Sequence, residues 1–265
     1  MSSKKIAKAK TAAVATEETT TNSKKNALGN GCYHVFLDVG ANIGIHVRFV
    51  YEPHKYPDVK KETTTIFTKY FGEVDRRDPR DICVFAFEPN PVHKERQEQL
   101  KEAYSNVGIR YLHIPVGVSD MDGKLTLYHQ GGTDPANNEK GFSTKEFKLV
   151  KSEKVAVELP VIRLRKWLED HTCIYERDIP ENPVGGAEAL KMEPSVIVKM
   201  DIEGSEYQLL PDLMSSGVLC NTVNYIFGEW HTSENAKFMS LKKYGQLNTH
   251  LEAVLNLIAN VDGCT

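Results

Sequence analysis

Long hydrophobic runs are missing from this 265-residue sequence. No apolar stretch approaches the roughly 18 to 20 residues that a membrane span needs, and the first residues do not form a secretory signal. Zinc-ligand spacings such as CxxC are also missing, because the five cysteines are scattered along the chain (Cys32, Cys83, Cys173, Cys220 and Cys264). We therefore expect reduced thiols in a soluble, intracellular protein of the cytoplasm.

A strong excess of charge of one sign is missing as well. The formal net charge of −3 gives no overall attraction to nucleic acid or to an anionic membrane. Residues 1–30 contain no aromatic residue and few bulky apolar ones, so they cannot bury enough surface to offset the entropy of ordering. We expect a disordered tail rich in Lys, Ala and Thr, followed by one folded domain over residues 31–265.

Alternating strand-like and helix-like segments make up that domain. Five runs have the composition of core strands, and most are followed by helical spacing of apolar residues: 32–38, 82–88, 109–119, 195–201 and 223–230. This alternation predicts a three-layer α/β/α, doubly wound, Rossmann-like fold with a mostly parallel sheet. Ligands of such folds bind at the carboxyl ends of the strands.

Local signals predict finer details of the fold. Asn90 and Pro91 suit the N-cap and the first position of a helix. Residues 124–129 alternate as in an antiparallel extension of the sheet, and Pro211 is expected to kink or divide its helix. Residues 51–80 are an insertion, longer than a usual connection, which either packs onto the core or forms a lid over the pocket.

The turn after the first strand reads DVGANIG. Gly40 and Gly44 let the backbone approach a ligand closely, and Asp38 can fix the loop or accept a hydrogen bond from a ligand's ammonium group. This is not the GxGxxG of dinucleotide-binding folds, and no Walker lysine is present. A nicotinamide cofactor therefore has limited support, and a nucleoside triphosphate has none.

Acidic residues also follow the second, fourth and fifth strands. Glu88, in FEPNP, can accept hydrogen bonds from both ribose hydroxyls of an adenosine, or it can be an ordinary charge at a helix N-terminus. Asp201 and Glu203, in KMDIEGSE, close the fourth strand. Glu229 and His231, in GEWH, close the fifth.

In this order, DVGANIG, FEPNP and KMDIEGSE resemble the FkbM-type methyltransferases, which use S-adenosylmethionine and act mainly on oxygen. The resemblance spans residues 32–231 and includes VGVSDMDGKLTLYH. It implies cofactor contacts, with Glu88 at the ribose and Ser119 or Asp120 on the adenine side; the implied set is Asp38, Gly40, Asn42, Gly44, Glu88, Ser119 and Asp120. Enzymes of this architecture usually end in a C-terminal hairpin, which we expect to be missing here.

The methyl acceptor should meet the donor beside four catalytic candidates, namely Asp201, Glu203, Glu229 and His231. His231 is the candidate general base for a hydroxyl acceptor, although it could equally hydrogen-bond a loop or cap a helix. The four side chains could instead hold a divalent ion, which is the less favoured reading. Lys199 is expected to pair with a neighbouring carboxylate.

We therefore predict an S-adenosylmethionine-dependent methyltransferase that methylates oxygen on a small-molecule or glycan-like acceptor, without a nucleic-acid partner. Its oligomeric state stays open. One alternative is a pseudo-enzyme or scaffolding subunit that binds the cofactor without transfer. Another is an RNA or protein methyltransferase, but the Asn/Asp-Pro-Pro-aromatic turn that serves base amino groups is replaced by DIEG at Asp201.

Overall fold

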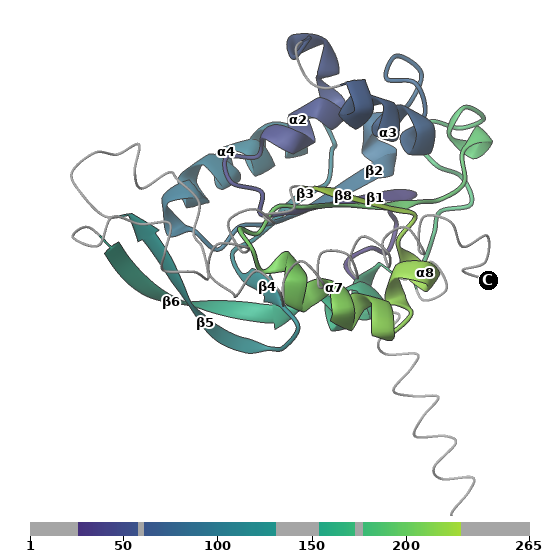
Figure 1. Ribbon diagram of the computed structural model, residues 1–265. Coiled ribbons are helices and arrows are strands. Elements are labelled where there is room, and N and C mark those ends of the chain that lie inside the picture. The colour runs from purple at the N-terminus through teal and green to yellow at the C-terminus, as the bar shows by residue number, and fades with distance from the viewer. Residues whose placement is uncertain (1–25, 58–60, 131–153, 173–176, 229–265) are drawn as a thin grey trace, which may run out of the picture.

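Five parallel strands form the central sheet of the protein (Figure 1). The computed structural model describes residues 26–57, 61–130, 154–172 and 177–228. The sheet has the order β3-β2-β1-β7-β8, with bounds β1 His34–Val39, β2 Ile82–Phe87, β3 Tyr111–Ile114, β7 Val196–Met200 and β8 Tyr225–Gly228. All five predicted runs contribute a strand to it, although the run 109–119 does so only through β3 and its last residues belong to another strand. The order reverses between β1 and β7, which makes their junction the switch point of a doubly wound fold.

Helices cover both faces of this sheet (Figure 1). One face carries α2 (Ile45–Tyr51), α3 (Lys61–Phe71) and α4 (Lys94–Ser105), and the other carries α6 (Leu164–His171), α7 (Glu206–Ser215) and α8 (Val218–Thr222). Alternate side chains of β1 enter separate cores: Phe36 packs with α2, α3 and α4, whereas Val35 and Leu37 pack with α6, α7 and α8. The predicted three-layer α/β/α fold is confirmed.

A second, three-stranded sheet lies beside the first. Its order is β4-β6-β5, with β4 at Gly117–Ser119, β5 at Gly123–Gln130 and β6 at Lys154–Arg163. The antiparallel pairing of residues 124–129 is confirmed, but these residues do not extend the central sheet. The reason is a tight turn at Val116, whose N–H donates to the carbonyl of Ile114 at 2.8 Å and separates β3 from β4.

Two proline signals have different outcomes. The Asn90 side chain accepts a hydrogen bond from the Val92 N–H at 3.0 Å, and Pro91 opens the 3₁₀ turn η3 (Pro91–His93) that leads into α4. Division of the helix at Pro211 is wrong, since α7 continues through it. A proline removes only one backbone bond, and burial of Leu209 and Leu213 holds the helix on the sheet.

The insertion packs onto the sheet through α3. Phe67 and Phe71 are buried in the core, and the Tyr70 hydroxyl donates to the carbonyl of Asn224 at 3.2 Å. The guanidinium of Arg77 donates to the carbonyls of Phe67 and Gly72 near the end of α3 and to Val50 in α2. Further short turns are η1 (Pro53–Lys55), η2 (Pro79–Asp81) and η5 (Ala189–Lys191). The lid role stays a prediction.

Residues 26–30, at the end of the predicted tail, are part of the described structure. Leu28 packs against the core, and the N–H of Gly29 donates to the carbonyl of His171 at 2.9 Å. Residues 1–25 lie outside the described ranges. Within the described ranges, no helix is long and apolar enough to cross a membrane.

Cys32 and Cys83 form a disulfide, with their Cα atoms 5.7 Å apart. Cys220 is disulfide-bonded as well. The prediction of reduced thiols is therefore wrong for Cys32, Cys83 and Cys220. Pairing of β1 with β2 brings Cys32 and Cys83 together although they are distant in the sequence. Disulfides are rare in cytosolic proteins, so the cysteines no longer support the predicted cytoplasmic location, which stays a prediction.

Removing this disulfide should destabilise the fold. The bond links residues 51 positions apart and so constrains the unfolded chain, which is typically worth about 2 to 4 kcal/mol. We expect the Cys32→Ala/Cys83→Ala variant to lose about that much free energy of unfolding in urea without reductant. The corresponding linked peptide should appear in a non-reduced digest of the wild type; its absence, or an unchanged urea midpoint, would contradict the disulfide.

Candidate functional site

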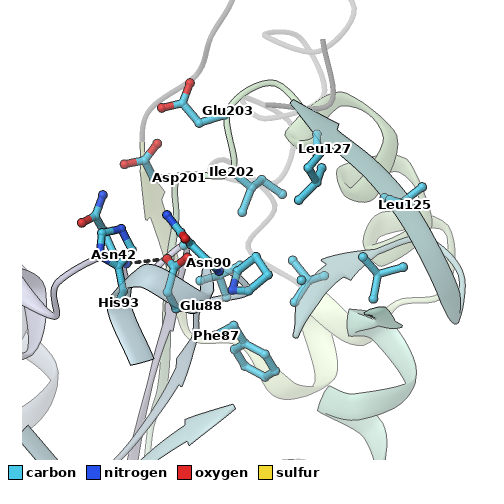
Figure 2. A pocket seen from close by; sticks show the side chains of 17 residues that line it. Asn42, Phe87, Glu88, Asn90, His93, Leu125, Leu127, Asp201, Ile202 and Glu203 are labelled. Atoms are coloured by element: carbon cyan, nitrogen blue, oxygen red, sulfur yellow. Dashed lines mark hydrogen bonds between the residues drawn. The ribbon is translucent and has the colours of Figure 1, made fainter. Parts of the chain in front are cut away.

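A pocket opens at the carboxyl ends of β1, β2 and β7 (Figure 2). The space between its walls, part of which is open to solvent, is about 730 Å³. Its lining residues are Val39, Gly40, Asn42, Phe87, Glu88, Pro89, Asn90, His93, Gly117, Val118, Leu125, Leu127, Val161, Asp201, Ile202, Glu203 and Ser205. The pocket thus lies where a doubly wound sheet binds its ligands.

The charged side chains of the pocket come from the loops of the central sheet, and part of its apolar lining comes from the second sheet. Loops at the ends of the central strands supply the carboxylates of Glu88, Asp201 and Glu203, and the second sheet supplies Leu125 and Leu127 on the opposite side (Figure 2). Among the described residues that line the pocket there is no lysine or arginine. This arrangement favours a ligand that combines a positive charge with an apolar part.

Glu88 joins the loops that follow β1 and β2. Its Oε2 accepts the N–H of Asn42 at 2.7 Å, and its Oε1 accepts the N–H of Asn90 at 2.8 Å. The residue is only 7% exposed, and this burial raises the pKa of its carboxyl group to about 7, against the lowering effect of the two backbone hydrogen bonds. Glu88 therefore changes charge near neutral pH.

The loop after β1, residues 40–44, is called the glycine loop. It is held in a backbone conformation that few residues adopt. Asn42 has a φ of 50°, and the Gln97 side chain on α4 fixes it by donating to the Asn42 carbonyl at 2.6 Å. The Tyr111 hydroxyl donates in turn to Gln97. A chain of hydrogen bonds from β3 through α4 thus positions the loop beside the pocket.

Gly40 and Gly44 have different structural tasks. A Cβ on Gly40 would lie 1.9 Å from the carbonyl oxygen of Asp201, so the loops after β1 and β7 touch there. A Cβ on Gly44 would lie 2.3 Å from Leu100 Cδ1, so this glycine lets α4 pack closely. Gly40 lines the pocket and Gly44 does not.

The structure brings together part of the predicted site. Five predicted residues line the pocket (Gly40, Asn42, Glu88, Asp201 and Glu203), and four described ones do not (Asp38, Gly44, Ser119 and Asp120). Asp38 is fully buried, and the Ser119 hydroxyl donates to Asp120 Oδ1 at 3.0 Å just beyond the lining residue Val118. Glu229 and His231 lie outside the described residues.

Other lining residues were not anticipated as site residues. Asn90 and His93 belong to the FEPNPVH turn, three positions apart, and that spacing on a turn at the strand end could have indicated them. Leu125 and Leu127 carry no such signal, because their place in the pocket depends on the second sheet.

Glu203 has a φ of 56°, and such backbone strain is concentrated at functional sites.

A metal centre is not assembled by the described residues, in which no group of three or more His, Cys, Asp or Glu side chains could hold an ion. The alternative metal site at Asp201 and Glu203 also needs Glu229 and His231, which lie outside these residues.

The family model of the methyltransferase FkbM domain matches residues 38–258. The chain belongs to the FkbM methyltransferase family. The match covers the glycine loop, Glu88 and the turn after β7, so the family predicted from the three motifs is confirmed.

A solved structure, the methyltransferase FkbM from Methylobacillus flagellatus KT, is similar to this chain at 14% sequence identity and a TM-score of 0.33. The likeness covers 71% of this chain and 30% of that one, so the chain spans less than a third of that protein's length. No curated protein matches the chain.

A comparison of Gly40→Ala with Gly31→Ala should separate the cost of the close contact at Gly40 from the cost of its backbone conformation. Gly31 has nearly the same φ (77° against 76°), but a Cβ there meets nothing within 4 Å. We expect Gly31→Ala to cost about 1 to 2 kcal/mol of unfolding free energy. Gly40→Ala should cost about 3 kcal/mol or more, because the clash with Asp201 adds to the strain. Urea denaturation measures both, and equal losses would contradict the contact between the two loops.

Proposed function

We propose that this FkbM-family methyltransferase transfers the methyl group of S-adenosylmethionine to an oxygen atom of a small-molecule or glycan-like acceptor. Family membership supports methyl transfer. The observation that carries the choice of donor is the carboxylate of Glu88, which lines the pocket at the end of β2. In doubly wound folds a carboxylate near this position hydrogen-bonds the ribose of an adenine nucleotide.

Glu88 retains capacity for a ribose in addition to its two backbone bonds. Each carboxylate oxygen has two lone pairs, and each oxygen of Glu88 accepts one backbone N–H. Its second lone pairs can therefore accept the two ribose hydroxyls. On the adenine side we propose Ser119 or Asp120, which follow the lining residue Val118.

The charge of the pocket also fits this donor. S-adenosylmethionine supplies a methyl group on a cationic sulfur, which an oxygen nucleophile attacks in line. The carboxylates of Asp201 and Glu203 stand at the end of β7, where the described lining residues include no lysine or arginine. These carboxylates favour a ligand carrying ammonium and sulfonium groups. To its amino-acid end we assign the backbone of Gly40 and Asn42, which line the pocket, with the fully buried Asp38 behind them.

Proton removal from a hydroxyl acceptor is assigned to the acidic end of β7 and to the predicted segment after β8. Asp201 and Glu203 line the pocket, and His231, two positions after Glu229 in the sequence, stays the candidate general base. A pseudo-enzyme or scaffolding subunit would bind the donor without turnover. An RNA or protein methyltransferase would use the same donor site, so an acceptor screen separates these alternatives.

Ligand titration into the purified chain tests the donor. We expect binding of S-adenosylmethionine and S-adenosylhomocysteine by calorimetry, and none of NAD. Glu88→Gln should weaken S-adenosylhomocysteine binding by about tenfold or more, the equivalent of roughly 1.4 kcal/mol. Glu158→Gln, on the exposed face of β6, is the matched control and should bind like the wild type. Absence of binding to the folded wild type would overturn the proposed function.

The pH dependence of the affinity for S-adenosylhomocysteine should reveal the ionisation of Glu88. Burial raises the pKa of this carboxyl group to about 7, and its ionised form accepts more hydrogen bonds than its protonated form. The affinity of the wild type for S-adenosylhomocysteine should therefore increase as the pH rises from about 6 to about 8, across that pKa. Glu88→Gln should be insensitive to pH in this range; an identical pH profile in the variant would contradict the role of Glu88.

A further inference from the structure

A lysine is buried in the middle of the central sheet. Lys199 lies on β7, where all five residues are buried, and only 2% of it is exposed. Its four neighbours in this strand are apolar. Burying an ammonium group costs free energy unless the charge is paired, and apolar residues often replace a buried ion pair at no loss of stability. Folding alone therefore does not require a lysine here.

The contacts of Lys199 converge on the switch point between β1 and β7. Its Nζ donates to the carbonyl of Gly40 at 2.8 Å. The same atom lies 3.5 Å from Asp38 Oδ1 and 3.6 Å from Asp201 Oδ2. One ammonium group thus contacts the end of β1, the glycine loop and the loop after β7.

Two of these three partners line the pocket, and Lys199 does not. Gly40 and Asp201 face the pocket, whereas Asp38 and Lys199 lie behind them. Asp38 is fully buried, its carboxylate accepts no hydrogen bond within the described structure, and the register pairs it with Lys199 across the sheet. Any effect of Lys199 on a ligand must therefore pass through Gly40 and Asp201.

We propose that Lys199 is a positioning residue for methyl transfer, whose ammonium group holds the glycine loop and Asp201 in their places around the donor. This inference rests on the proposed function. The hydrogen bond to the Gly40 carbonyl fixes the loop that passes the donor, and the charge of Lys199 orients the carboxylate of Asp201. Lys199 also offsets the negative charge of Asp38 within the sheet. Any effect of Asp38 on the pocket is therefore exerted through Lys199.

A double-mutant cycle separates positioning from stability. Lys199→Met leaves the buried carboxylate of Asp38 with only the imidazole of His46, whose Nδ1 lies 3.9 Å from Asp38 Oδ1, and so should lower the melting temperature. In the Asp38→Asn background no such carboxylate remains, and Lys199→Met should cause little loss of melting temperature. Loss of positioning, in contrast, should weaken S-adenosylhomocysteine binding by about tenfold or more in both backgrounds.

Ile82→Ala is the control for general destabilisation. Ile82 is fully buried at the start of β2, at the opposite end of that strand from Glu88. This variant should melt earlier and still bind S-adenosylhomocysteine like the wild type below its melting temperature. If the Asp38→Asn variants do not fold, Lys199→Met is compared with Ile82→Ala at equal distance below their melting temperatures.

The outcomes distinguish the inference from the function on which it rests. Unchanged affinity on Lys199→Met in the Asp38→Asn background would overturn the positioning role, as would an affinity loss that follows the melting temperature across all variants, Ile82→Ala included. A wild-type chain that does not bind S-adenosylhomocysteine would overturn the proposed function, and the inference with it.

Discussion

Backbone atoms of the loops after β1 and β7 touch at Gly40 and Asp201, and no side chain fits between them. The Asp201 N–H donates to the carbonyl of Val39 at 3.0 Å, so the two loops are joined as the strands end. This contact lies at the switch point of the sheet, where adjacent connections run to opposite faces. Gly40 and Asp201 both line the pocket, so this backbone contact fixes how the two loops meet there.

Glu88 extends the same constraint to the end of β2. By accepting N–H groups from both Asn42 and Asn90, its carboxylate ties the loops after β1 and β2 together. The cost of burying it is visible in its raised pKa. A buried carboxylate bonded to backbone on both oxygens has a fixed orientation, which suits recognition of two neighbouring hydroxyl groups. Rigidity and ligand binding therefore depend on the same side chain.

Much of the fold could be predicted because its signals are local. The five core strands are short apolar runs that end in turns, and alternation with helical segments dictates a parallel sheet. The site residues Gly40, Glu88 and Asp201 were also predictable, since parallel strands bring their carboxyl ends to one edge. Of the two effects predicted for Pro211, a kink or a division of the helix, the division is wrong, because tertiary burial of Leu209 and Leu213 outweighs one lost hydrogen bond.

The sequence by itself determined the fold class, the family and the order of the acidic turns, because each depends on patterns within a few neighbouring residues. Only the tertiary structure decided the pairing of Cys32 with Cys83, the separate sheet that brings Leu125 and Leu127 to the pocket, and the place of Lys199 beside Asp38 of the neighbouring strand. These features join residues far apart in the chain, and their distances are set by strand order and register, which no local pattern encodes.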